Sequence, residues 1–92
     1  GLSENIIRVI PDGLGIAVDS SAWPQPPVFA WLQQHGNIEQ SEMWRTFNCG
    51  IGFVLVMDDA HADAAIAGLA ADGFAAWRIG CVTHGGERVV IR

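Results

Sequence analysis

The chain has 92 residues, a formal net charge of −5 and 50% hydrophobic residues. This length allows one small domain. All five basic residues are arginines scattered along the chain, whereas nucleic-acid binding requires clustered positive charge. No apolar run reaches the roughly 18 residues of a membrane span. We therefore expect neither a nucleic-acid nor a membrane partner.

The cysteines and the N-terminal residues indicate the compartment. Cys49 and Cys81 lack the CxxC spacing of a metal or redox motif. The first residues lack the basic and then apolar pattern of a signal peptide. We expect two free thiols in a reducing cytoplasm, although counting alone also allows one disulfide.

The N-terminal part of the chain contains a segment that fits two conformations, followed by one predicted strand. Residues 6–10 fit either a strand or a short helix, and the sequence Pro-Asp-Gly that follows is typical of a turn. Residues 14–19 alternate small with β-branched side chains and predict a strand.

Two short helices are predicted next. Pro26 and Pro27 suit a helix entry, and Gly36 is expected to end that helix in the left-handed conformation. Asn37, with Gln40 three residues later, resembles a capping box for a helix over residues 39–46.

The second half of the chain predicts a strand, a helix and a hairpin. Residues 51–57 are apolar on both faces, which is typical of a central strand. A helix is expected to begin at Asp58 or Asp59 and to end at Gly73. Residues 77–82 alternate as a strand, and residues 84–87 are expected to turn it back into a last strand over 88–91.

This order, β-α-α-β-α-β-β, predicts an α+β fold, a mixed α/β sandwich with one mixed sheet and helices mainly on one face. The last two strands are expected to form an antiparallel hairpin at a sheet edge. The mean hydropathy of +0.26 is high for so short a chain. We therefore expect an uncovered apolar face through which the chain self-associates.

Two polar clusters are candidate sites. Arg45 and Asn48 offer a guanidinium and an amide that suit a phosphate or carboxylate, but Arg45 equally suits a pair with Glu42 while Asn48 closes a turn. Glu4 and Asn5, which follow a serine, suit phosphate or magnesium binding, or only the capping of a helix.

No catalytic residue is assigned by pattern. Cys49 has no histidine near it in sequence to make its thiolate, so we expect a buried structural cysteine. The histidines at 35, 61 and 84 fall on separate elements without metal-ligand spacing, and we expect no metal site from them.

Two stretches carry a resemblance to a known family. GLSENIIRVIPDGL and FAWLQQHGNIEQSEMWRTFNCGIG closely resemble the C-terminal domain of the aminoimidazole ribonucleotide synthetases, also called phosphoribosylformylglycinamidine cyclo-ligases. The resemblance runs in order over nearly all 92 residues to the closing ERVVIR. One departure is Ile7, where the family has proline in its ENIPRV motif.

The resemblance implies the function and the domain organisation. The family enzyme is a cytoplasmic homodimer that uses ATP with Mg²⁺ to close formylglycinamidine ribonucleotide to aminoimidazole ribonucleotide in purine biosynthesis. Residues 1–92 are then a single domain, the later part of the C-terminal domain, with the N-terminal nucleotide-binding domain absent. The fragment itself is expected to be inactive and to hold no cofactor.

The resemblance also implies that Glu4 and Asn5 lie near the ligand, with Arg45 and Asn48 as further candidates. The alternative is a stand-alone, non-catalytic binding or assembly module of the same fold. The reading frame upstream of Gly1 would distinguish the two.

Overall fold

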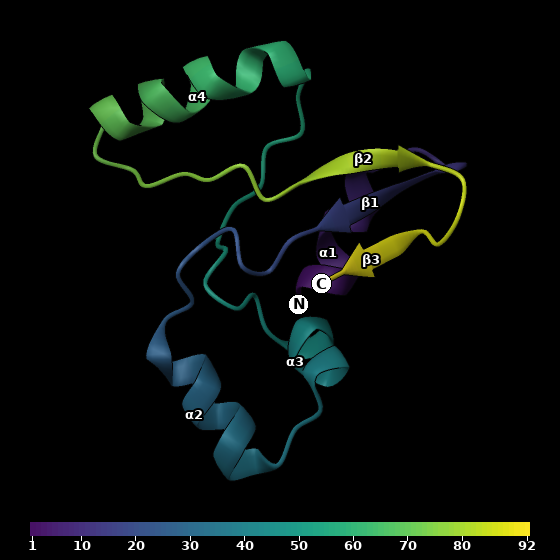
Figure 1. Ribbon diagram of the computed structural model, residues 1–92, viewed down its shortest axis with the longest axis vertical. Coiled ribbons are helices and arrows are strands. Elements are labelled where there is room, and N and C mark those ends of the chain that lie inside the picture. The colour runs from purple at the N-terminus through teal and green to yellow at the C-terminus, as the bar shows by residue number, and fades with distance from the viewer.

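A three-stranded mixed sheet forms the centre of the computed structural model, which describes residues 1–92 (Figure 1). β1 (Leu14–Val18) lies between β2 (Gly80–His84) and β3 (Val89–Ile91). β1 runs antiparallel to β2 and parallel to β3, with Ile16 opposite Val82 on one side and Val89 on the other. The predicted α+β fold with one mixed sheet is confirmed.

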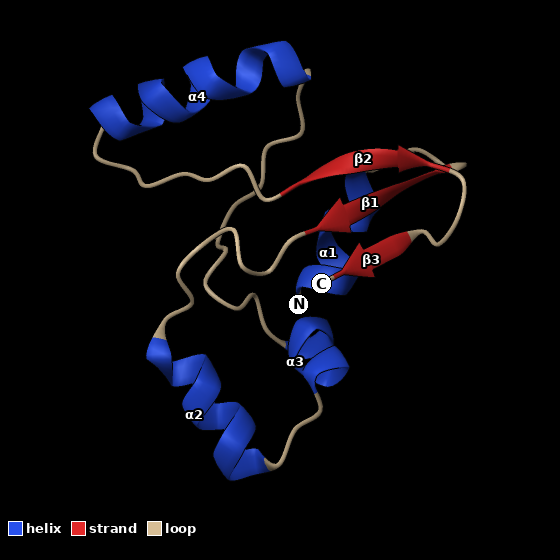
Figure 2. Ribbon diagram, in the orientation of Figure 1, coloured by secondary structure: helices blue, strands red, loops and turns tan.

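Four helices and one 3-10 turn accompany the sheet (Figure 2). They are α1 (Leu2–Asn5), the 3-10 turn Ile6–Val9, α2 (Pro27–Gly36), α3 (Gln40–Thr46) and α4 (Asp59–Ala71). α1 packs against α3, whereas α4 stands apart from the sheet on two long connections (Figure 1). The expectation of helices mainly on one sheet face is not confirmed. No helix is both long and apolar enough to span a bilayer.

The predicted central strand over residues 51–57 is wrong. These residues belong to no strand, and residues 52–57 make no backbone hydrogen bond. Both edges of β1 are occupied by β2 and β3, and residues 51–57 pair with neither outer edge of those two strands. A strongly apolar run is therefore left without a neighbour to pair with, because a strand exists only where a ladder partner is available. The predicted element order fails at this position.

The predicted antiparallel hairpin is also wrong. β2 and β3 lie on opposite sides of β1, and Gly85 and Gly86 turn the chain with φ of 69° and 67°. The Arg88 guanidinium then donates to the carbonyl of Leu14 at 2.6 Å and to that of Ile10 at 3.1 Å. These bonds hold the returning chain at the start of β1, so β3 pairs with the far edge.

Helix and strand boundaries differ from the prediction at three places. Gly36 remains helical, and Asn37 takes the left-handed conformation with φ 51° as the last cap of α2. The cap of α3 is therefore Glu39, and no capping box forms. Asn37 tolerates the left-handed conformation because its short polar side chain compensates the strain. β2 starts at Gly80, three residues later than expected.

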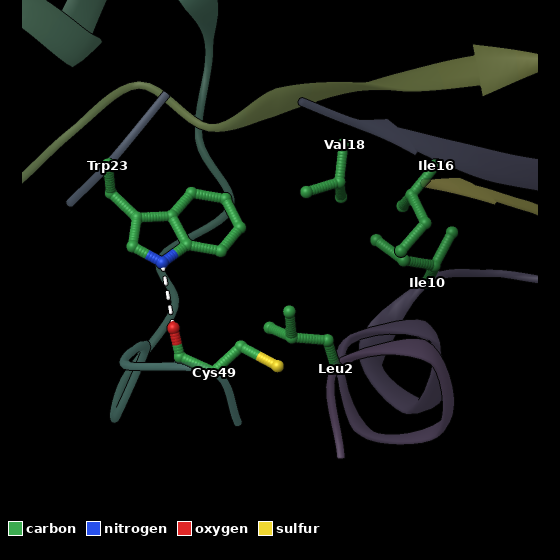
Figure 3. Packing of buried hydrophobic residues seen from close by; sticks show 6 residues of the cluster. All are labelled: Leu2, Ile10, Ile16, Val18, Trp23 and Cys49. Carbon is green, nitrogen blue, oxygen red and sulfur yellow. Dashed lines mark hydrogen bonds between the residues drawn. The ribbon is translucent and has the colours of Figure 1, made fainter. Parts of the chain in front are cut away.

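The core is small, and neither α2 nor α4 contributes a side chain to it. Six buried side chains form its main cluster (Figure 3): Leu2, Ile10, Ile16, Val18, Trp23 and Cys49. The indole Nε1 of Trp23 donates to the backbone carbonyl of Cys49 at 3.0 Å, in buried surroundings. This bond connects the loop after β1 to the segment after α3, 26 residues away.

Trp23→Phe removes that donor and leaves the Cys49 carbonyl unpaired in the core. We expect the free energy of unfolding to fall by about 2–3 kcal/mol, from the lost hydrogen bond and the smaller ring. Chemical denaturation measures this change. Trp31→Phe, at an indole that is 56% exposed, is the matched control and should change stability by less than about 0.5 kcal/mol. Equal losses in the two variants would contradict the role of the Trp23 bond.

Candidate functional site

The candidate site lies where α1 meets the last turn of α3. The Leu2 amide donates to the carbonyl of Phe47 at 3.1 Å. A Cβ atom on Gly1 would overlap the carbonyl groups of Trp44 and Arg45, so only glycine allows this approach. The contact brings residues 4 and 5 close to residues 45 and 48, which are at least 40 positions away in sequence.

Asn5 and Asn48 line the same cavity, which has a volume of about 340 Å³. The Asn5 Nδ2 donates to the Gly1 carbonyl at 2.8 Å, and the Asn48 Oδ1 accepts from the Gly50 amide at 2.9 Å. The Asn48 amide group therefore keeps both of its N–H donors, and Asn5 keeps its carbonyl oxygen. The rest of the lining is mostly apolar and comes from Gly1, Leu2, Ile6, Val9, Ile51, Gly52, Phe53 and Val54.

Arg45 lies beside this cavity but is not part of its lining. Its guanidinium pairs with Glu42 at 3.0 Å and with Glu4 at 3.8 Å. The Arg45 side chain is 61% exposed, and such surface pairs hold a guanidinium only weakly. The expected Arg45–Glu42 pair and the turn closed by Asn48 are both present. An anion would bind Arg45 by displacing one carboxylate.

The sequence candidates thus form two adjacent groups rather than one. Asn5 and Asn48 share the cavity, and Glu4 and Arg45 share an ion pair. Glu4 and Asn5 lie inside α1, where no side chain caps the helix, so the capping alternative is wrong. No group of three or more His, Cys, Asp or Glu side chains converges within the 92 residues, so they offer Mg²⁺ no cluster of ligands.

Cys49 shapes the turn that carries Asn48. It takes the left-handed conformation with φ 52°, and Gly50 follows with φ 100°. A Cβ on Gly50 would lie 2.6 Å from the Pro26 Cδ, so this second position needs glycine. The Cys49 side chain is 1% exposed, and burial raises the pKa of its thiol. Both cysteines are free, and Cys49 is structural, as the sequence indicates.

The contribution of Trp23, Val9 and Phe53 was not predicted from the sequence. Trp23 holds the turn through its bond to Cys49, whereas Val9 and Phe53 line the cavity and are 72% and 86% exposed. For Trp23, the only indication in the sequence was the presence of four tryptophans. No local pattern distinguishes the other two, because their place depends on contacts between distant segments.

The raised pKa and burial of the Cys49 thiol predict slow alkylation. At mildly alkaline pH, iodoacetamide should modify the exposed Cys81 at least about tenfold faster than Cys49, because burial shields the Cys49 sulfur and lowers its thiolate fraction. Peptide mass spectrometry measures both rates, with Cys81→Ser as the assignment control. Denaturant should remove the difference. Equal rates in the folded chain would show that Cys49 is accessible and not a structural core residue.

Comparisons with known proteins agree with the resemblance noted from the two sequence stretches. A family model described as AIR synthase related protein, C-terminal domain, matches residues 1–92. The phosphoribosylformylglycinamidine cyclo-ligase of Xanthomonas oryzae pv. oryzae (strain PXO99A) is 62% identical over 93 residues, which cover 99% of this chain and 27% of that protein.

The proteins of the same name from Xanthomonas campestris pv. campestris (strain B100) and Xylella fastidiosa (strain 9a5c) are 61% and 55% identical over 93 residues. Each match covers 99% of this chain, and 27% and 26% of those proteins. The chain therefore spans about a quarter of the length of these curated relatives. It belongs to the AIR synthase related family, and its 92 residues match the C-terminal domain of that family.

Proposed function

We propose that this chain is the later part of the C-terminal domain of an ATP-dependent cyclo-ligase that converts formylglycinamidine ribonucleotide to aminoimidazole ribonucleotide. The observation that carries the proposal is the match of all 92 residues to the family, with relatives named phosphoribosylformylglycinamidine cyclo-ligase at 55–62% identity. The 92 residues alone are inactive in this proposal, because the N-terminal nucleotide-binding domain is absent from them.

The proposed chemistry consists of two displacements. The formyl amide oxygen attacks the γ-phosphorus of ATP, so an O–P bond forms while the bond to ADP breaks. The amidine nitrogen then attacks the same formyl carbon, a C–N bond closes the ring, and inorganic phosphate leaves with the former amide oxygen. The nitrogen loses its proton to solvent or a base. A protein accelerates such steps mainly by positioning the groups and by stabilising negative charge.

The residues at the α1–α3 contact suit the positioning role. The free N–H donors of Asn48 would bind a substrate oxygen, and the free carbonyl oxygen of Asn5 would accept a substrate N–H. The Arg45 guanidinium, held by two surface carboxylates, would exchange one of them for a phosphate oxygen. Glu4 then serves to keep Arg45 near the cavity in the absence of ligand.

The proposal also covers the metal, the oligomeric state, the compartment and the partners of the whole enzyme. Mg²⁺ would accompany ATP as its counterion, the enzyme would be a homodimer, and it would act in the cytoplasm on small molecules without nucleic-acid or membrane partners. No cluster of ligands for Mg²⁺ lies within these 92 residues, so the metal would be held by residues outside them and by the phosphates.

Arg45→Ala in the whole enzyme tests the proposed phosphate contact. We expect kcat/KM to fall about tenfold to hundredfold, because a hydrogen bond to a charged group contributes about 1.5–3 kcal/mol. Glu42→Ala is the matched control: it removes the same ion pair but leaves the guanidinium, so kcat/KM should change little. Cys49→Ala should also retain most activity. Similar losses in all three variants would indicate a purely structural role for Arg45.

Titration of the 92-residue chain with ATP tests where the nucleotide site lies. We expect no tight binding and no ring closure, since the proposed nucleotide site lies mainly outside these residues. Isothermal titration calorimetry measures binding, and the whole enzyme titrated in parallel provides the reference. Tight stoichiometric binding of ATP to the 92 residues would contradict this placement.

A further inference from the structure

Glu4 connects the Arg45 ion pair to the cavity of the candidate site. Its Oε1 lies 3.8 Å from the Arg45 Nη1, and the next residue of α1, Asn5, lines the cavity together with Asn48. Consecutive Cα atoms are about 3.8 Å apart, so the Glu4 side chain starts beside that of Asn5 and reaches toward Arg45. In the proposed function the other three residues bind the ligand, whereas Glu4 acts only in its absence.

The two carboxylates that hold Arg45 are not equivalent. Glu42 lies three residues before Arg45 on α3 and accepts from its Nε at 3.0 Å. Glu4 comes from α1, and its 3.8 Å separation from Arg45 exceeds hydrogen-bond length. The Glu4 side chain is 54% exposed, and an exposed pair of this kind contributes little stability. A phosphate that binds Arg45 therefore displaces Glu4 rather than Glu42.

Release from Arg45 leaves the Glu4 carboxylate beside the ligand without a donor. An ionised carboxylate only accepts hydrogen bonds, so it repels the phosphate instead of binding it. Hydroxyl groups are suitable new donors, because O–H···O⁻ bonds are short and charge-assisted. An acidic residue holds a ribose hydroxyl in this way in dinucleotide-binding folds.

The order of these protein groups matches the order of groups in a ribonucleotide. Arg45 suits the phosphate, and the two asparagines suit the neutral amide and amidine. In the proposed substrate the ribose joins these two parts, and Glu4 joins the corresponding protein groups. We propose that Glu4 accepts hydrogen bonds from the ribose hydroxyls and thereby selects a ribonucleotide over its 2′-deoxy form. The inference rests on the proposed function, which supplies the substrate.

This exchange makes Glu4 a specificity-determining residue. A ribonucleotide gives Glu4 new donors in place of the guanidinium that its phosphate takes. Inorganic phosphate, a product of the proposed reaction, takes the guanidinium and offers no hydroxyl in return. Glu4 therefore opposes the binding of free phosphate at Arg45 and permits that of a phosphate attached to ribose.

The first test is kinetic and uses the whole enzyme with the substrate and with its 2′-deoxyribose analogue. Wild-type enzyme should prefer the ribose form in kcat/KM about tenfold to hundredfold, the effect of one hydrogen bond to a charged group. Glu4→Ala should reduce this preference to about twofold or less, mainly through lost activity on the ribose form. Glu4→Gln keeps an acceptor oxygen without the charge and should retain an intermediate preference.

Glu42→Ala is the matched control for the kinetic test. It removes the other carboxylate from Arg45 but not the group beside Asn5, so it should keep the wild-type preference for ribose. Circular dichroism should show that all three variants remain folded.

Direct binding separates this inference from the proposed function. Calorimetric titration of the whole enzyme with ribose 5-phosphate and 2-deoxyribose 5-phosphate requires no ring closure. We expect tighter binding of the ribose form and loss of the difference in Glu4→Ala. Absence of ring closure in the wild type would contradict the proposed function and leave this binding difference measurable. A wild type that binds both sugars equally would overturn the role of Glu4, and so would a preference that survives Glu4→Ala or is lost equally in Glu42→Ala.

Discussion

The buried hydrogen bond from the Trp23 indole to the Cys49 carbonyl is the constraint on which the arrangement of this protein depends. It fastens the loop after β1 to the turn after α3, and these segments would otherwise meet only through apolar contacts. The bond also fixes the Cys49 backbone in a conformation that is unfavourable for a side-chain-bearing residue. Because a buried carbonyl must be paired, the indole and the strained turn depend on each other.

This constraint reaches the candidate site through a single residue. Asn48 precedes Cys49, and its Oδ1 closes the same turn by accepting from the Gly50 amide. The core therefore determines the position of the side-chain N–H donors of Asn48. Asn5 reaches the cavity from the other side because α1 packs tightly on the last turn of α3. The two amides are therefore held by rigid backbone, whereas Arg45 and Glu4 are surface groups that can change partners.

Residues 52–79, which comprise α4 and its two connections, show the opposite situation, in which strong local preference lacks a tertiary partner. α4 forms on its own alanine-rich sequence, and Arg78 ties it to the returning connection. The apolar segment that precedes α4 cannot form a strand in the same way, because helices satisfy their backbone internally and strands do not. Because strands need a neighbour and helices do not, residues 52–57 stay unpaired and an open apolar gap lies beside them.

The sequence by itself determined the class of fold, β1, the three longer helices and the buried character of Cys49, and it named four candidate residues. It also carried the family resemblance. These features follow from local periodicity, turn residues and composition. Only the tertiary structure decided that β3 pairs parallel to β1, that residues 52–57 stay unpaired, and that Asn5 meets Asn48 in one cavity. Such outcomes depend on which distant segments compete for the same edges, and no local pattern records that competition.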